Sequence, residues 1–292
     1  MTARNTCGNV NILSFDIEEY FHVEAARVDP AQWPAYESRL APSVERILEM
    51  LCASGAGATF FVLGWVAARH KKLIRQIAEQ GHEIASHGNE HRMIGKQSPE
   101  QFLADLDTAT QMLQDITGKR VLGYRAPTFS VTHRTAWALD VLEQAGYQYD
   151  SSVFPIRHDR YGVRQAPARP HYAITPSGSR ILEIPPLTLD VAWARLPMGG
   201  GGYLRLWPTW LVGGAIAIAQ RKNIPAMIYL HPWEMDPDQP VLIMSRLSRW
   251  RHRLNLTKTS AKLDCLLRKF TFTSVQSQLQ TLQRVTSTYR YG

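Results

Sequence analysis

The chain has 292 residues, 45% of them hydrophobic, which is enough to bury a large core and excludes a disordered or fibrous polypeptide. Its net charge of +8 is uneven, because residues 241–292 contain ten Lys or Arg and one acid, Asp264, leaving the first 240 residues close to neutral. This basic region indicates an acidic partner, whether a membrane face, a nucleic acid or an anionic polymer, although a solvated helical surface explains it equally well.

The predicted elements alternate between strands and helices along most of the chain. Continuous short apolar runs predict strands buried on both faces, and apolar residues at helical spacing predict the helices between them. In chain order we predict a strand at 10–15, a helix from 41 to 54, a strand at 58–63, a helix at 73–80, a strand at 82–86, a helix at 99–117, a strand at 121–124, a helix at 132–145, strands at 147–149 and 181–184, a helix around 210–219 and a strand at 227–230.

The helix after residue 98 has the clearest start signal. Ser98 is the predicted N-cap, Pro99 occupies the first helical position and Gln101 lies three residues after the cap. Gly118 is the predicted end of this helix.

Seven strands alternating with helices predict a parallel α/β barrel, whose active site lies at the carboxyl ends of the strands. Chemically reactive side chains fall at these predicted ends. They are Asp16, His87, His91, Arg125, Asp150 and His231. Their shared placement predicts a single site, since chance alone explains one or two such residues more easily than six.

His87 and His91 are the firmest candidates for metal binding. Two histidines four residues apart can direct both imidazoles at one ion, although such pairs are also common on protein surfaces. A carboxylate from the first strand end would complete a catalytic site, and we assign it to Glu18. Asp16 lies on the same side of the extended segment, so it is free to act as general base. The alternative is that these acids form a solvated turn.

Arg125 and His231 are the candidates for supporting roles in acid and base catalysis. Arg125 precedes a proline and would pair with Asp16 or Asp150, keeping the base ionised and oriented; a surface ion pair is the alternative. His231 would protonate a leaving nitrogen as general acid, unless it is a hydrogen-bonded core histidine.

These segments together resemble the polysaccharide deacetylases of the NodB-homology kind, also called carbohydrate esterase family four. The similarity runs in the family's motif order over roughly residues 9 to 240. The similar segments are Ser14-Phe15-Asp16, Ser86-His87 through His91, Arg125-Ala126-Pro127, Asp150 through Phe154, and Leu230-His231. The chain looks most like the subfamily found in bacterial exopolysaccharide and exosortase gene clusters.

The resemblance implies a distorted (β/α)7 barrel that removes acetyl groups from N-acetylated sugars with a divalent metal, Zn²⁺ above Co²⁺ or Ni²⁺. It implies Asp16 as base, His231 as acid, supporting catalytic roles for Arg125 and Asp150, and Glu18, His87 and His91 as metal ligands. It also implies an oxyanion contact from a backbone N–H near Thr128. Substrate contacts are expected at Thr128, Phe129, Leu230 and Trp233.

Three positions depart from the family pattern. Ile17 replaces the usual second aspartate, so metal binding depends on Glu18. Thr128 and Phe129 follow the arginine-proline motif where the family has a tyrosine, and Phe154 corresponds to its tryptophan. Two other classes therefore stay open: a metal amidohydrolase of the same fold acting on a small non-sugar amide, and a catalytically silent polysaccharide-binding relative.

We divide the chain into a barrel at residues 9–240 and a basic, mostly helical extension at 241–292 that packs on it. Cys7, Cys52 and Cys265 are odd in number and far apart, which fits a reducing compartment. No leader or membrane-spanning run is recognised, so we expect a cytoplasmic protein, peripheral to the inner membrane at most. The expected partner is an acetylated oligo- or polysaccharide, and no specific nucleic acid is expected.

Overall fold

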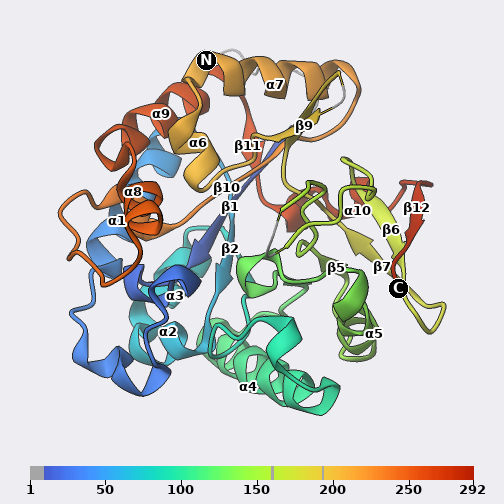
Figure 1. Cartoon of the computed structure of the whole chain (residues 1–292), viewed down its shortest axis with the longest axis horizontal. Helices are drawn as coiled ribbons and strands as arrows, with labels where there is room; N and C mark the ends of the chain where they lie inside the picture. The colour runs from blue at the N-terminus through green and yellow to red at the C-terminus, as the bar shows by residue number, and fades with distance from the viewer. Residues whose placement is uncertain (1–9, 159–160, 193) are drawn as a thin grey trace.

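The fold is organised around a ring of parallel strands (Figure 1). A computed structural model describes residues 10–158, 161–192 and 194–292. Cys7 and the predicted domain start at residue 9 lie outside this range. Within the described residues, the ring strands are β1 (Asn11–Ile17), β2 (Thr59–Val62), β3 (Glu83–Ser86), β4 (Gly123–Tyr124), β5 (Tyr149–Asp150), β7 (Arg180–Glu183) and β10 (Met227–Leu230).

The ring closes unevenly, which makes the barrel a distorted one. Neighbouring strands pair in parallel in the order β10, β1, β2, β3, β4, β5 and β7. Between β7 and β10 the Leu187 amide donates a hydrogen bond to the Met227 carbonyl (2.9 Å), where regular strand pairing would otherwise continue. The distorted (β/α)7 barrel expected from the sequence is confirmed.

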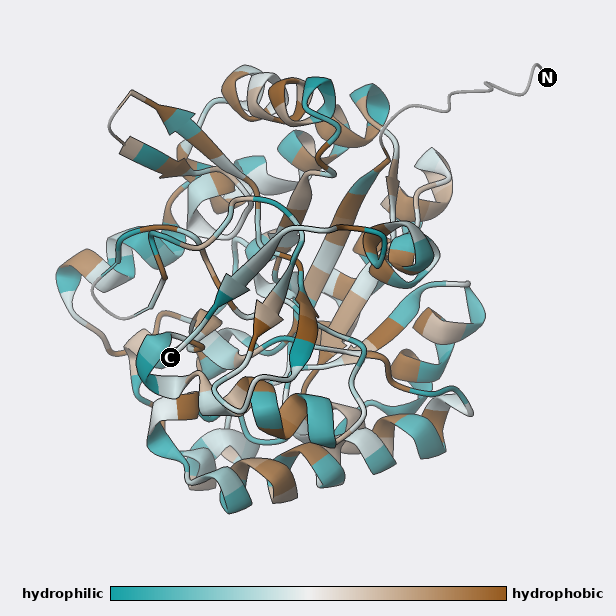
Figure 2. Ribbon diagram, turned by 90° about the vertical axis from the view of Figure 1, so that its right-hand side faces the viewer, coloured by the Kyte–Doolittle hydropathy of each residue, from teal (hydrophilic) through white to brown (hydrophobic). Residues whose placement is uncertain are grey.

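The ring strands are buried on both faces, as their continuous apolar runs predict. Figure 2 shows them as largely brown ribbons at the centre, while the surrounding helices alternate between brown and teal. The helices are α1 (Leu40–Ser54), α2 (Gly64–Arg69), α3 (Lys71–Glu79), α4 (Pro99–Thr117), α5 (Trp137–Gln144), α6 (Gly202–Leu206), α7 (Thr209–Arg221), α8 (Arg246–Arg253), α9 (Leu256–Lys269) and α10 (Val275–Leu282).

Local signals locate the ends of α1 and α4 well. Ser98 accepts a hydrogen bond from the Gln101 amide (3.2 Å), and the Gln101 side chain accepts one from the Ser98 amide (3.0 Å). Gly55 and Gly118 end the two helices with φ of 68° and 66°, a conformation that glycine adopts without strain. The predicted capping box is confirmed.

Five further strands have no counterpart in the predicted pattern. They are β6 (His171–Ile174), β8 (Thr188–Val191), β9 (Ala194–Pro197), β11 (Phe272–Thr273) and β12 (Thr288–Arg290). The C-terminal region supplies two of them, because β11 pairs with β1 and β12 pairs with β6. None of the helices in the described residues is long and apolar enough to cross a membrane.

Candidate functional site

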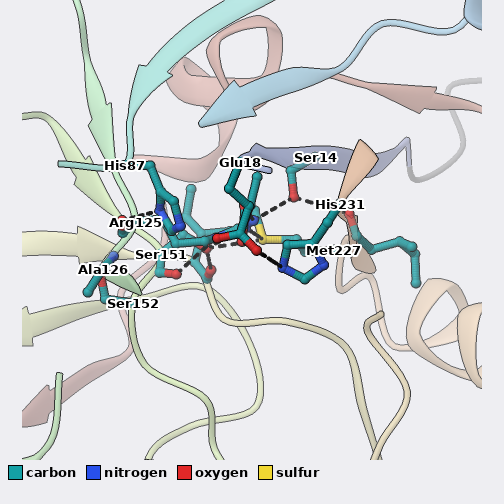
Figure 3. A network of polar contacts seen from close by, with 12 residues as sticks. Ser14, Glu18, His87, Arg125, Ala126, Ser151, Ser152, Met227 and His231 are labelled. Atoms are coloured by element: carbon teal, nitrogen blue, oxygen red, sulfur yellow. Dashed lines mark hydrogen bonds and ion pairs between the residues drawn. The ribbon is translucent and has the colours of Figure 1, made fainter. Parts of the chain in front are cut away.

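The register of the ring brings the predicted site residues to one edge of the sheet. Ile17 pairs with Val62, Val62 with Ser86, and Ser86 with Tyr124. The residues that follow these strand ends, Glu18, His87 and Arg125, therefore emerge side by side at the carboxyl end of the barrel. His231 follows β10 at the same edge (Figure 3).

Glu18, His87 and His91 form a cluster with the chemistry of a metal site. Their ligand atoms all lie within 4.8 Å of one another, and all three residues are buried. His91 Nε2 lies 2.6 Å from Glu18 Oε2. Two imidazoles and one carboxylate are a donor set typical of catalytic zinc sites, which keep positions open for water and substrate.

The hydrogen bonds around the cluster prepare it for a cation. His87 Nδ1–H donates to the Arg125 carbonyl (2.7 Å), which leaves the Nε2 lone pair free to coordinate. Burial lowers the pKa of His87 to about 4, so the ring is neutral near pH 7. Burial alone would raise the pKa of Glu18, but His91 and His231 outweigh it and hold this pKa well below its ordinary value. These residues fit a divalent metal.

Backbone geometry fixes the turn between the two histidines. Gly88 has φ of 79°, and a Cβ at this position would meet the Asp105 carboxylate at 2.9 Å. Asp105 in α4 accepts a hydrogen bond from the Asn89 amide (2.7 Å). Helix α4 therefore holds the turn that carries His87 and His91.

Asp16 is held by Arg125, whose side chain is fully buried. Arg125 Nη1 donates to Asp16 Oδ1 (2.6 Å) and to the Ser14 hydroxyl (3.0 Å). Its guanidinium also stacks over the Phe61 ring at 4.0 Å. The remaining carboxylate oxygen of Asp16 lies 3.8 Å from His231 Nε2. The sequence predicted that Arg125 pairs with Asp16 or with Asp150, and in the structure it pairs with Asp16.

Within the described part of the chain, Arg125 forms its ion pair with Asp16 and not with Asp150. Asp150 is fully buried and accepts a hydrogen bond from Ser152, whose hydroxyl accepts one from the Ala126 amide (2.7 Å). Burial raises the pKa of Asp150 to about 6. Burial and the neighbouring Asp150 also raise the pKa of Glu183 well above its ordinary value. Asp150 therefore supports the turn after β4 through Ser152 and the Ala126 amide. Its catalytic role stays a prediction.

His231 stands on the open side of the cluster, with 17% of its side chain exposed. Its Nε2 lies 3.7 Å from Glu18 Oε1, and its Nδ1 lies 2.7 Å from Glu234 Oε1. Burial lowers its pKa, but Glu18, Glu234 and Asp16 outweigh burial and raise this pKa to about 9. His231 is therefore protonated near pH 7, as a general acid has to be.

The residues expected to contact substrate lie in different environments. Thr128 and Phe129 follow Pro127 with φ of 59° and 50°, which is strained backbone for residues with side chains. The Phe129 ring is buried against Tyr229, with ring centroids 4.9 Å apart, and Leu230 is fully buried. Trp233 is 7% exposed, stacks on His231, and donates its indole N–H to Glu18 Oε1 (3.0 Å).

Sequence reasoning missed the pair that supports His231. Glu234 Oε2 accepts a hydrogen bond from Arg205 Nε (2.6 Å), and both side chains are buried. The three-residue spacing from His231 to Glu234 was the available signal, because Glu234 bonds both the backbone and the ring of His231. The sequence around Arg205 does not indicate this contact, because Arg205 lies in α6, far from Glu234 in the chain.

Two family models match consecutive parts of the chain. Residues 33–149 match the polysaccharide deacetylase family, and residues 151–280 match a domain of unknown function, DUF3473. The second match crosses residue 240, where we placed the domain boundary from the sequence.

Curated relatives are similar to this chain over about two fifths of its length. A peptidoglycan deacetylase-like protein of Gibberella zeae, FGM2, is 32% identical over 112 residues, which are 38% of this chain and 32% of the relative. A peptidoglycan deacetylase of Helicobacter pylori is 27% identical over 125 residues, 41% of this chain and 40% of the relative. The matched segment thus spans less than half of either relative.

A solved structure extends the likeness in fold to nearly the whole chain. A protein of Mycobacterium smegmatis, provisionally described as a polysaccharide deacetylase, superposes with a TM-score of 0.65 at 18% identity. The superposition covers 97% of this chain and 94% of that one. At this identity the likeness establishes the fold alone.

Proposed function

Because the chain belongs to the polysaccharide deacetylase family, carbohydrate esterase family four, we propose that it is a metal-dependent deacetylase. The proposed reaction is hydrolysis of the acetamide of N-acetylated sugars in a bacterial exopolysaccharide or its precursor. The observation that carries this proposal is the convergence of Glu18, His87 and His91 in one cluster beside Asp16 and His231.

Glu18, His87 and His91 would hold the cation, for which Zn²⁺ fits the donor set best and Co²⁺ or Ni²⁺ are alternatives. When bound, the ion would act as a Lewis acid that polarises the acetyl carbonyl and makes water more acidic. Trp233 would orient Glu18 through its indole N–H, so we assign it a positioning role in addition to any contact with sugar.

Asp16 would accept the proton of the attacking water as the oxygen bonds to the acetyl carbon. Arg125 holds Asp16 in a fixed orientation, because the guanidinium donates to one carboxylate oxygen and leaves the other facing His231. A backbone N–H near Thr128 would stabilise the negative charge that develops on the carbonyl oxygen.

His231 would then give its proton to the sugar nitrogen as the carbon–nitrogen bond breaks, releasing acetate and a free amine. Glu234 accepts the hydrogen bond from His231 Nδ1, so the proton available for transfer is the one on Nε2, which faces the cluster. Leu230 and Phe129 would form the apolar wall against the acetyl methyl group.

Acetate release is the direct test. Purified protein is incubated with acetylated chito-oligosaccharides, peptidoglycan fragments and cyclic amides, with and without chelator. We expect acetate from an acetylated sugar, its loss on chelation, and recovery on adding Zn²⁺. The double variant His87→Ala with His91→Ala should lose metal and activity, while the control His70→Ala with His133→Ala, away from the cluster, should keep both.

Other outcomes decide between the remaining classes. Turnover of cyclic amides alone would indicate an amidohydrolase of the same fold. Bound metal without turnover of any substrate would favour a silent polysaccharide-binding relative, and absence of metal from the wild-type protein under metal-replete conditions would overturn the proposal.

A further inference from the structure

The segment from Val241 to Trp250 exposes large apolar side chains at unusual density. Val241 is 59% exposed, Ile243 95%, Leu247 55% and Trp250 57%. Leu242, between the first two, is only 6% exposed, so the chain before α8 alternates inward and outward. Leu247 and Trp250 are three residues apart and share a face of α8. Exposed apolar clusters of this kind mark interaction sites.

Unpaired positive charges are interleaved with this apolar cluster. Arg246, Arg249 and Arg251 are exposed, and no acidic side chain in the described part of the chain forms an ion pair with them. The nearest acids in sequence are Asp238 and Asp264. Exposed cations beside exposed apolar groups are complementary to a surface that is negative outside and apolar beneath.

The segment is held rigidly on the barrel. His252 Nε2 lies 2.9 Å from Gln239 Oε1, and the buried Arg205 guanidinium donates to the carbonyls of His252 and Leu254 at 2.8 Å each. Ser245 caps α8 through the Ser248 amide (3.2 Å). Because the anchoring residues are buried, the exposed residues form a preorganised surface.

We propose that this surface, Val241 to Arg251, docks on an anionic lipid bilayer. Ile243, Leu247 and Trp250 would enter the boundary between headgroups and acyl chains, and the three arginines would contact the headgroups. An anionic polymer in water would interact with the arginines, but it offers no apolar interior in which the Ile243 side chain could be buried. The combination of features therefore favours a bilayer, and this inference goes beyond the proposed reaction.

The docking surface lies beside an approach to the candidate site. Ile243 and Met244 line a groove of about 610 Å³ together with residues far away in sequence, among them Glu24 and Met93. A second groove of about 800 Å³ shares Glu24 and Met93 with the first and extends to His91. A docked molecule would hold the first groove close to the bilayer. Docking itself does not depend on the proposed reaction.

Vesicle flotation of the full-length protein tests the proposal without turnover. The probes are vesicles of phosphatidylcholine, alone or mixed with phosphatidylglycerol, at low and high salt, and dextran sulfate as a lipid-free anionic polymer. We expect binding to the mixed vesicles that weakens with salt, and much weaker binding to phosphatidylcholine alone. Brominated lipids should quench Trp fluorescence more in the wild type than in Trp250→Phe.

Two triple variants separate charge from apolar insertion. Arg246→Gln, Arg249→Gln and Arg251→Gln together should weaken binding on the order of a hundredfold, since each cation at such a surface contributes about fivefold. The charge-matched control replaces Arg180, Arg284 and Arg290 with Gln; Arg290 lies in β12, on the opposite side of the molecule from α8 (Figure 1). The control should bind like the wild type.

The apolar variant carries Ile243→Ser, Leu247→Ser and Trp250→Ser and should bind at least about tenfold more weakly. Its control changes three exposed apolar residues on other elements to Ser: Leu103, Val191 and Ile218. Two outcomes would contradict docking on a bilayer and favour an anionic polymer. One is vesicle binding by the apolar variant that equals that of the wild type. The other is binding to dextran sulfate that is as strong as binding to vesicles and is unchanged in the apolar variant. No binding to any vesicle would overturn docking altogether.

Discussion

Asp16 is the residue on which the proposed proton transfer depends. Asp16→Asn removes the proton acceptor but none of the three candidate metal ligands, so the variant should retain the metal while acetate release falls by about 10²- to 10⁴-fold. Acetate release and metal content are measured on the same preparation, with the exposed Asp107→Asn as control. Retention of most activity would remove Asp16 as the base.

We expect Glu234 to influence the alkaline limit of the proposed activity through its hydrogen bond with His231. A general acid works only while protonated, so activity should fall as pH rises through the His231 pKa. Without a bound cation, Glu18, Glu234 and Asp16 raise this pKa to about 9 against the effect of burial, and a cation on Glu18 would offset part of that rise. Glu234→Gln removes one raising charge, and the alkaline limb of the pH–rate profile should move to lower pH. The exposed Glu79→Gln should leave the profile unchanged. An unshifted limb in Glu234→Gln would separate Glu234 from the proton donor.

The sequence located the candidate site residues better than their partners. His87 and His91 lie four residues apart in the chain, so their spacing alone predicted a shared target. Arg125 had two plausible carboxylates, and only the register of β1 against the rest of the ring shows that Asp16 takes the hydrogen bond. Contacts across the barrel depend on how distant strands align, which no local pattern encodes.

Ser98 tests whether a local signal read from the sequence contributes to stability. Ser98→Ala removes the hydroxyl that accepts from the Gln101 amide at the start of α4, and should lower the free energy of unfolding by about 1 kcal/mol. Urea denaturation measures the change. Thr108→Ala, an exposed hydroxyl within the same helix, should cost clearly less, and an equal cost for both variants would contradict a specific capping role.

The elements that were predicted and those that were not differ in physical origin. The ring strands and α4 can be recognised from the local sequence. The strands are marked by apolar runs that are buried in the structure, and α4 is marked by its capping residues. The strands β11 and β12 are only two or three residues long and are defined by pairing with β1 and β6, far away in sequence. Pairing between segments so far apart cannot be inferred from the sequence on either side of them.

At the scale of the whole molecule, we propose that residues 241–292 belong energetically to the barrel. Several side chains in this region are almost completely buried, and Thr59 and Glu83 of the ring accept hydrogen bonds from the amides that open α10, at 2.8 Å each. The buried side chains include Leu263, Leu266, Phe272 and Val275. At about 1.5–3 kcal/mol each, four such side chains contribute as much as a typical domain's entire stability of about 5–15 kcal/mol.

A pair of leucine substitutions in this region tests the proposal. Leu263→Ala, at a fully buried position in α9, should lower the free energy of unfolding of the whole chain by about 2–5 kcal/mol within a single cooperative transition. Leu247→Ala, at a 55% exposed position in α8, should change it by less than about 0.5 kcal/mol. Denaturation is followed by circular dichroism and by tryptophan fluorescence, and the two probes should coincide. A separate early transition in Leu263→Ala, with the barrel unfolding at its wild-type midpoint, would make residues 241–292 an independent unit that is only attached to the barrel.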